Sequence, residues 1–265
     1  MDRLFALCVA MLLGACATPG GPSIDTRYSA KGQDSRAQFL VIHYTEANFE
    51  DSLRILTRGS VSAHYLLSNE SPPIIYRLVD EDRRAWHAGV SSWKGSTMLN
   101  GNSIGIEIVH AGFVDSPQGR QWPPYADAQI DALIPLLQDI VARHGIRPDR
   151  MLGHSDVAPQ RKVDPGPRFP WQRLADLGLI VWPNAARVAE QRLLYEQQLP
   201  DVAWFQAALA AHGFSVPLSG ELDVPTSKVI AAFQMKYRPA RFDGMPDAET
   251  AALLQVLNTT AVATR

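Results

Sequence analysis

The segment Phe39-Leu40-Val41-Ile42-His43 decides the fold. A short, continuous apolar run of this length predicts a buried strand. Other apolar or alternating runs predict further strands, and apolar residues at helical spacing predict helices between them. The expected strands are 39–43, 63–67, 74–78, 103–109 and 150–153, and the expected helices are 51–58 and 126–144. Strands interleaved with helices indicate an α/β fold, with a central mixed β-sheet flanked by helices.

The C-terminal part of the chain is predicted to be helical. An amphipathic connecting helix is expected at 185–199, followed by three short helices after Pro200. The last two contain an internal repeat at an offset of 24 residues, in which Gly220, Asp223, Thr226, Val229, Ile230 and Phe233 match Gly244, Asp247, Thr250, Leu253, Leu254 and Leu257. In each copy the glycine can form a tight turn, the aspartate can cap the helix, and the apolar residues share one face. We therefore expect a small C-terminal three-helix domain.

The N-terminus has the features of an export signal. The apolar run 4–13 is too short to span a bilayer, but it has the length of a signal-peptide core. The residues Leu13-Gly14-Ala15-Cys16 resemble the bacterial lipoprotein signal, which implies that Cys16 carries lipid and becomes the mature N-terminus. The alternative is an ordinary signal peptide cleaved near Ala15 or Ala17. Ala17 after the cysteine resembles lipoproteins of the outer membrane, so we expect a palmitate-type anchor there, facing the periplasm.

Composition narrows the class of protein. A chain of 265 residues, 46% of them apolar, can form one medium domain and a smaller one without covalent staples. The formal net charge of -2 gives no electrostatic reason to expect nucleic acid as a partner. Because Cys8 and Cys16 both lie in the signal, the mature domains have no thiol for a disulfide or a cysteine-ligated metal. Nothing in the sequence requires more than a monomer.

Histidines and a carboxylate lie at strand ends, where α/β proteins commonly assemble a site. His43 ends the strand 39–43, His154 follows the strand 150–153, and Asp164 lies in a loop stiffened by prolines. Two imidazoles and one carboxylate are a common ligand set for catalytic zinc, with a fourth position left open. From spacing alone a histidine at a strand end is more often a hydrogen-bonded structural residue than a ligand, and Asp156 competes with Asp164 as the third ligand.

Three motifs resemble the type-2 N-acetylmuramoyl-L-alanine amidases, namely VIHYT at 41–45, GHSDVAP at 153–159 and KVDPG at 162–166. The resemblance extends from about Gln38 to Trp171. That family shares its fold with peptidoglycan-recognition proteins and a phage lysozyme-amidase. By this resemblance, His43, His154 and Asp164 would be the ligands of Zn²⁺.

Glu107 and Lys162 are the candidate catalytic residues. In the strand 103–109 alternate isoleucines face one way, whereas Gly105 and Glu107 face the other, and Gly105 leaves room for a substrate. A carboxylate in such a strand is costly to bury unless it is paired or functional. Periodicity alone leaves a salt bridge with a nearby arginine equally open. The resemblance implies that Glu107 is the general base and that Lys162 stabilises the oxyanion.

Residues around the expected cleft are candidates for substrate contacts. Tyr44 and Thr45 could contact the stem peptide, while Trp86 and His87 could contact sugar and peptide. A core position for Trp86 remains an alternative. His64 is expected in the core or supporting the site. The histidines expected at the surface are His110, His144 and His212.

The C-terminal helices resemble the three-helix peptidoglycan-binding domain of wall hydrolases, particularly at Phe205-Gln206 and Phe233-Gln234. The alternative is a helical appendage with no binding role. The expected organisation is a signal peptide at 1–16, a tether at 17–31, a zinc amidase domain at 32–182, a connecting helix at 183–200 and the peptidoglycan-binding-like domain at 201–258.

The resemblance implies zinc-dependent hydrolysis of the amide between N-acetylmuramic, or anhydromuramic, acid and L-alanine in peptidoglycan or muropeptides. One alternative is a recognition module that binds peptidoglycan without cutting it, which the combined presence of His43, His154, Asp164 and Glu107 disfavours. The other is a zinc peptidase that acts within the stem peptide. The position of the new amine terminus distinguishes the amidase from the peptidase.

Overall fold

The computed structural model describes residues 21–117 and 119–263. The chain divides into two units between Asp34 and Ser35. The described residues of the first unit, 21–34, form no helix or strand, and the expected signal peptide and Cys16 lie outside the described residues. In the part of the chain that is described, no helix is long and apolar enough to cross a membrane.

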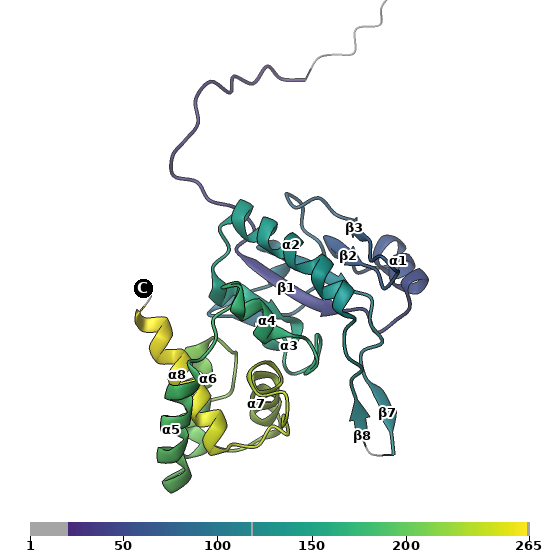
Figure 1. The fold of residues 1–265 in the computed structure, drawn as a ribbon. Helices are drawn as coiled ribbons and strands as arrows, with labels where there is room; N and C mark the ends of the chain where they lie inside the picture. Colours follow the sequence, from purple (N-terminus) through teal and green to yellow (C-terminus); the bar gives the residue numbers. More distant parts are fainter. Residues whose placement is uncertain (1–20, 118, 264–265) are drawn as a thin grey trace, which may run out of the picture. The chain divides into compact units, whose positions relative to one another are not determined.

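A five-stranded sheet forms the centre of the second unit (Figure 1). Its strands lie in the order β3 (Ile75–Arg77), β2 (Tyr65–Leu67), β6 (Ser103–Ile108), β1 (Phe39–Tyr44) and β9 (Met151–Gly153). The pairs β2–β6, β6–β1 and β1–β9 are parallel, and β2–β3 is antiparallel. This confirms the predicted mixed sheet. The central position of β1 explains its continuous apolar sequence, because all six of its residues are buried.

The helix α2 (Asp127–His144) packs on one face of the sheet. The packed side chains come from alternate strand positions and from one face of the helix, and they include Leu40, Ile42, Ile104, Ile106, Ile108, Ile130, Leu133, Leu137 and Ile140. Gly145 ends α2 in the left-handed conformation, with φ 65°, as the periodicity predicts. Because this face of β1 and β6 is committed to the core, His43 and Glu107 must point to the other face.

Shorter elements surround the sheet. The helix predicted at 51–58 is α1 (Phe49–Arg58), and Asn48 caps it by accepting a hydrogen bond from the Asp51 N–H at 2.9 Å. The remaining elements of this region are β4 (Ser92–Trp93), β5 (Ser96–Thr97), η1 (Leu99–Gly101), β7 (Val114–Ser116), β8 (Gly119–Gln121), η2 (Pro148–Arg150), α3 (His154–Val157) and α4 (Trp171–Asp176). Segments this short show no periodicity, so the sequence did not predict them.

Four helices follow: α5 (Ala185–Gln197), α6 (Val202–His212), α7 (Val224–Tyr237) and α8 (Ala248–Ala263). The first, α5, is the predicted connecting helix, and it lies along α8 without a buried residue of its own. The other three confirm the predicted three-helix domain. Their shared core includes Phe205, Leu209, Val229, Ile230, Phe233, Leu254 and Leu257.

The internal repeat has a structural basis in helix capping and tight turns. Asp223 accepts a hydrogen bond from the Thr226 N–H, and Asp247 accepts one from the Thr250 N–H, both at 2.8 Å. Ahead of these caps lie Gly220, with φ 77°, and Gly244, with φ 75°. Each glycine adopts the left-handed conformation of a tight turn, and the helix capped by the aspartate begins after that turn.

The Phe-Gln steps belong to the same repeat. The Gln206 side chain accepts a hydrogen bond from the Gly220 N–H at 2.8 Å and donates one to the Thr226 hydroxyl at 2.9 Å. Gln234 makes the matching pair of bonds to Gly244 and Thr250, at 2.9 and 3.0 Å. Both glutamines are fully buried, so these bonds satisfy amides that would otherwise be costly to bury.

Candidate active site

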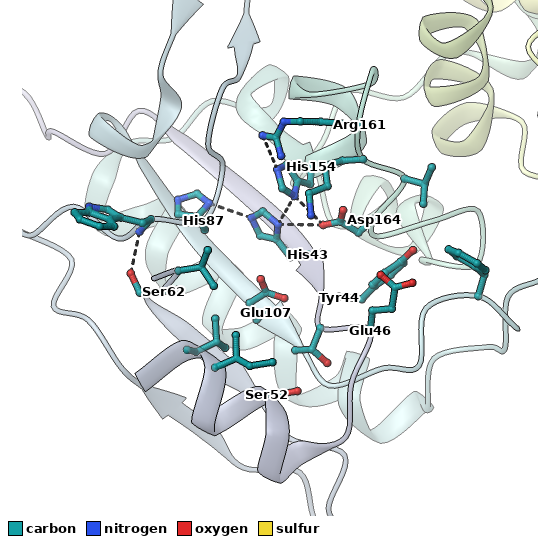
Figure 2. Close-up of a pocket in the computed structure, with 18 of the residues that line it drawn as sticks. His43, Tyr44, Glu46, Ser52, Ser62, His87, Glu107, His154, Arg161 and Asp164 are labelled. Carbon is teal, nitrogen blue, oxygen red and sulfur yellow. Dashed lines mark hydrogen bonds and ion pairs between the residues drawn. The ribbon is translucent and has the colours of Figure 1, made fainter. Parts of the chain in front are cut away.

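Three predicted ligands meet at one edge of the sheet (Figure 2). His43 lies near the end of β1, and His154 directly follows the neighbouring parallel strand β9, so both side chains reach the same edge. The two Nδ1 atoms are 3.0 Å apart. Asp164, from the following loop, places its Oδ2 atom 3.0 Å from the His43 Nδ1 and 3.1 Å from the His154 Nδ1. All three residues are buried.

A chain of hydrogen bonds behind His43 determines which of its nitrogens carries the proton. The Ser103 hydroxyl donates to the Leu99 carbonyl at 2.5 Å, so its oxygen is free to accept from the His87 Nε2 at 3.0 Å. The His87 Nδ1 must then accept from the His43 Nε2, also at 3.0 Å. The His43 Nδ1 consequently faces the cluster as a lone pair.

The same reasoning applies to His154. Its Nε2 lies 3.2 Å from the Ala88 carbonyl, to which it can only donate, so its Nδ1 also faces the cluster as a lone pair. Burial, together with the nearby His154, lowers the pKa of His43 to about 4, which keeps this ring neutral near pH 7. Burial alone would raise the pKa of Asp164, but the two histidines outweigh it and hold that carboxyl ionised.

Two imidazole nitrogens and one carboxylate oxygen therefore converge with no proton between them. Such an arrangement is repulsive unless a cation lies among the three atoms, and this is a donor set that zinc prefers. The residues thus fit a divalent metal ion. Asp156, the rival third ligand, lies elsewhere, because its Oδ2 accepts hydrogen bonds from the Gly153 N–H at 2.8 Å and from the Lys236 Nζ at 2.7 Å.

Glu107 lies next to His43 across the β1–β6 pair and points into the same cavity (Figure 2). Its Oε2 is buried and has no hydrogen-bond partner among the described residues. Burial, with the nearby Asp164 carboxylate, raises the pKa of Glu107 well above its usual range, and Lys162 opposes that rise. Within the described ranges no arginine pairs with Glu107, which excludes the salt bridge as the reason for its position.

The cavity beside these residues measures about 440 Å³. Its walls include all four predicted substrate contacts, Tyr44, Thr45, Trp86 and His87, and Lys162 also lines it. The Trp86 side chain is exposed by 54%, so it is not a core residue. The Thr45 hydroxyl donates to the Ala47 carbonyl at 3.1 Å. The Tyr44 hydroxyl is buried, with no partner among the described residues.

His87 has a second role that the sequence did not predict, and Gly105 differs from expectation. The His87 ring lines the cavity, as predicted, but it is also hydrogen-bonded to the His43 ring. The expectation that Gly105 leaves room for a substrate is wrong. A Cβ atom at Gly105 would lie 2.3 Å from the His87 Cγ, so the absent side chain makes room for the imidazole.

The remaining histidines are structural. His64 is confirmed as a core residue, since its Nδ1 accepts from the Gly105 N–H at 3.0 Å and its Nε2 donates to the Arg83 carbonyl at 3.1 Å. His110 is buried and stacks on Tyr125 at 4.2 Å, so its predicted surface position is wrong. The same prediction is wrong for His212, whose ring packs edge-on against Trp93 and Phe233. His144 is partly exposed, and its Nε2 lies 2.8 Å from the Glu81 Oε2.

Arg161 is a residue of the site that sequence reasoning missed. Its guanidinium donates to the Ala88 and Val90 carbonyls, and the Ala88 carbonyl is also the acceptor that orients His154. Arg161 therefore fixes the segment that follows His87 over the metal ligands. The contacts join parts of the chain about 70 residues apart, and only a folded structure brings them together.

An α/β fold with a buried His–His–Asp cluster beside an unpaired buried glutamate is typical of metal-dependent hydrolases. The sequence matches the N-acetylmuramoyl-L-alanine amidase family over residues 33–167, and a peptidoglycan binding domain over residues 198–254. The chain belongs to the N-acetylmuramoyl-L-alanine amidase family and is an enzyme of that class.

One similar protein spans nearly the whole chain, and another covers less than half of it. The N-acetylmuramoyl-L-alanine amidase AmiD of Escherichia coli (strain K12) is 43% identical over 97% of this chain and 98% of its own length. The 1,6-anhydro-N-acetylmuramyl-L-alanine amidase AmpD of Enterobacter cloacae is 40% identical, over 43% of this chain and 55% of its own length.

Two solved structures are similar over both the sheet and the C-terminal helices. The complex of AmiD from E. coli with anhydro-N-acetylmuramic acid-L-Ala-D-gamma-Glu-L-Lys superposes with a TM-score of 0.82, at 42% identity, over 91% of this chain and 95% of that one. AmpDh3 from Pseudomonas aeruginosa, in complex with anhydromuramic pentapeptide, gives a TM-score of 0.84, at 37% identity, over 90% and 98%.

Substitution of Gly105 tests the hydrogen-bond chain behind His43. Gly105→Ala is expected to displace the His87 ring, lower the free energy of unfolding by about 1–3 kcal/mol and lower activity roughly 10- to 100-fold. Thermal unfolding and amide-hydrolysis rates measure both effects. Gly101→Ala is the matched control, because an added Cβ there meets nothing within 4 Å. Full activity in Gly105→Ala would show that His87 does not support His43.

Proposed function

We propose that this amidase is zinc-dependent and cuts the amide between N-acetylmuramic, or anhydromuramic, acid and L-alanine in peptidoglycan or its fragments. The observation that carries the proposal is the convergence of His43, His154 and Asp164 beside Glu107 in one cavity. The inclusion of anhydromuramic fragments among the substrates is supported by the anhydromuramic ligands named for the similar AmiD and AmpDh3 structures.

His43, His154 and Asp164 would hold the zinc ion through the three atoms that face one another. When bound, zinc supplies Lewis-acid chemistry, polarising the scissile carbonyl and lowering the pKa of water. The protein itself orients the metal ligands. Hydrogen bonds from His43 to His87 and from His154 to the Ala88 carbonyl fix both rings before substrate arrives.

Glu107 is the general base in this proposal. Its unpaired Oε2 takes a proton from the attacking water as the new C–O bond forms at the lactyl carbonyl. It then gives that proton to the nitrogen of L-alanine as the C–N bond breaks. A pKa raised by burial suits the second transfer, because the protonated carboxyl is then readily formed. Lys162 places a cation in the same cavity, where it stabilises the developing oxyanion.

The cavity walls provide complementary surfaces for sugar and peptide. The half-exposed ring of Trp86 is a platform for an apolar sugar face, and Tyr44 lines the cavity where the stem peptide would lie. Thr45 lines the same wall. Contacts of this kind would orient the lactyl amide toward Glu107.

The proposal extends to the location of the enzyme. A lipid on Cys16 would anchor the protein at the outer membrane, facing the periplasm, with 17–31 as a tether. Support comes from the sequence Leu13-Gly14-Ala15-Cys16. The helices of 201–258 would bind peptidoglycan, for which the family match over 198–254 is the support. The enzyme would act as a monomer.

Product masses test the reaction directly. With purified peptidoglycan and added zinc, the protein should release stem peptides that begin with a free L-alanine amine and leave the lactyl carboxyl on the sugar. A chelator should abolish release and zinc should restore it, because hydrolysis needs the metal ion that the three ligands would hold. Intact amide bonds would instead identify a recognition module, and new amines within the stem would identify a peptidase.

Glu107→Gln tests the general base. The variant should fold and bind zinc like the native protein, yet its kcat should fall by about 100- to 10,000-fold, because the amide cannot accept the proton. The control is Glu50→Gln at an exposed position of α1. Turnover close to that of the control would remove Glu107 from the mechanism.

A further inference from the structure

We propose that Lys236, in the C-terminal helical domain, is a positioning residue for the metal ligand His154. It would act through Asp156 on the short helix α3, of which His154 is the first residue. The inference rests on the proposed metal-dependent function. It makes the helical domain part of the architecture of the catalytic centre, in addition to any role in binding the wall.

The ammonium group of Lys236 contacts residues outside the C-terminal helices. It lies near the end of α7, and its Nζ is 2.7 Å from the Asp156 Oδ2, 3.2 Å from the Met151 carbonyl and 4.3 Å from the centre of the Trp171 ring. The exposed fraction is 6% for Lys236 and 1% for Asp156. Two charges buried this far are tolerated because each neutralises the other.

The other contact of Asp156 ties the ion pair to the metal site. The same Oδ2 atom accepts the Gly153 N–H at 2.8 Å, at the residue where β9 ends and α3 begins. Next to it, the Ser155 N–H donates to the Asp164 carbonyl at 2.8 Å. One carboxylate oxygen thus joins Lys236 to the turn that orients His154 and, through Ser155, to the loop of Asp164.

Packing leaves this turn little freedom on its remaining side. A Cβ atom at Gly153 would lie 2.6 Å from the Pro165 Cδ and 3.4 Å from the Trp171 ring. That ring is also the one on which the Lys236 ammonium rests. The start of α3 is therefore held between the Pro165–Trp171 wall and the ion pair from the helical domain.

The direct test measures the zinc dissociation constant of the full chain by competition with a chromophoric chelator. Lys236→Met should weaken zinc binding roughly 10- to 100-fold, the usual effect of losing a group that orients a metal ligand. It should lower kcat with little change in KM, because Lys236 does not line the cavity of about 440 Å³. Lys236→Arg should retain most of the affinity, since the side chain borders two hollows of about 190 and 670 Å³ that leave room for a guanidinium.

Lys228→Met is the matched control. Lys228 also lies on α7 and also crosses to the catalytic domain, where its Nζ donates to the Gln160 carbonyl at 2.8 Å, but this contact is exposed and does not involve α3. Its loss should leave the zinc dissociation constant and kcat unchanged. Equal zinc affinities in Lys236→Met and Lys228→Met would overturn the inference, whatever happened to thermal stability.

A double variant keeps the test decisive if Lys236→Met does not fold. Asp156→Asn with Lys236→Met removes both charges, and the asparagine oxygen can still accept the Gly153 N–H. Zinc binding should remain weaker than in the native protein, because α3 has lost its tether to α7. Native zinc affinity in this variant would show that Asp156 and Lys236 only balance each other's charge, and it would overturn the inference. Absence of zinc binding in the native protein would instead overturn the proposed function, and this inference with it.

Discussion

The whole site depends on three buried ligand atoms that lie within 3.1 Å of one another, each with a lone pair facing the other two. The Nδ1 atoms of His43 and His154 and the Oδ2 of Asp164 repel one another, so the surrounding structure must hold them in place. Adjacent parallel strands supply the two histidines, and outward hydrogen bonds to His87 and the Ala88 carbonyl fix the two rings. A metal ion bound by all three atoms would remove this repulsion.

Other features follow from the need to hold that cluster. Gly105 lacks a side chain because the ring of His87 occupies the space, and Arg161 ties down the segment whose carbonyl orients His154. On the far side, the ion pair between Asp156 and Lys236 reaches the same turn from the helical domain. Supports of this kind surround a cavity in which the one unpaired carboxylate among these residues, that of Glu107, is left free to move protons.

Much of this could be predicted from sequence, where the pattern is local. The apolar run of β1, the period of α2 with Gly145 at its end, and the repeat of Gly220 and Gly244 each leave a signature within a few residues. The ligand set was predicted through the motifs around His43 and His154. The roles of His87 and Lys236 were not, because their partners lie 44 and 80 residues away and no periodicity links them. The prediction for Gly105 failed for the same reason, because the sequence does not show which neighbouring side chain fills the space beside a glycine.

The most direct test of the account is X-ray absorption at the zinc edge, on the full chain loaded with one equivalent of zinc. If these residues are the ligands, the zinc coordination shell should contain two imidazole nitrogens and at least one carboxylate oxygen, and His154→Ala should remove one imidazole. A shell without imidazole, or one unchanged by His154→Ala, would contradict the claim that these three side chains share one metal ion.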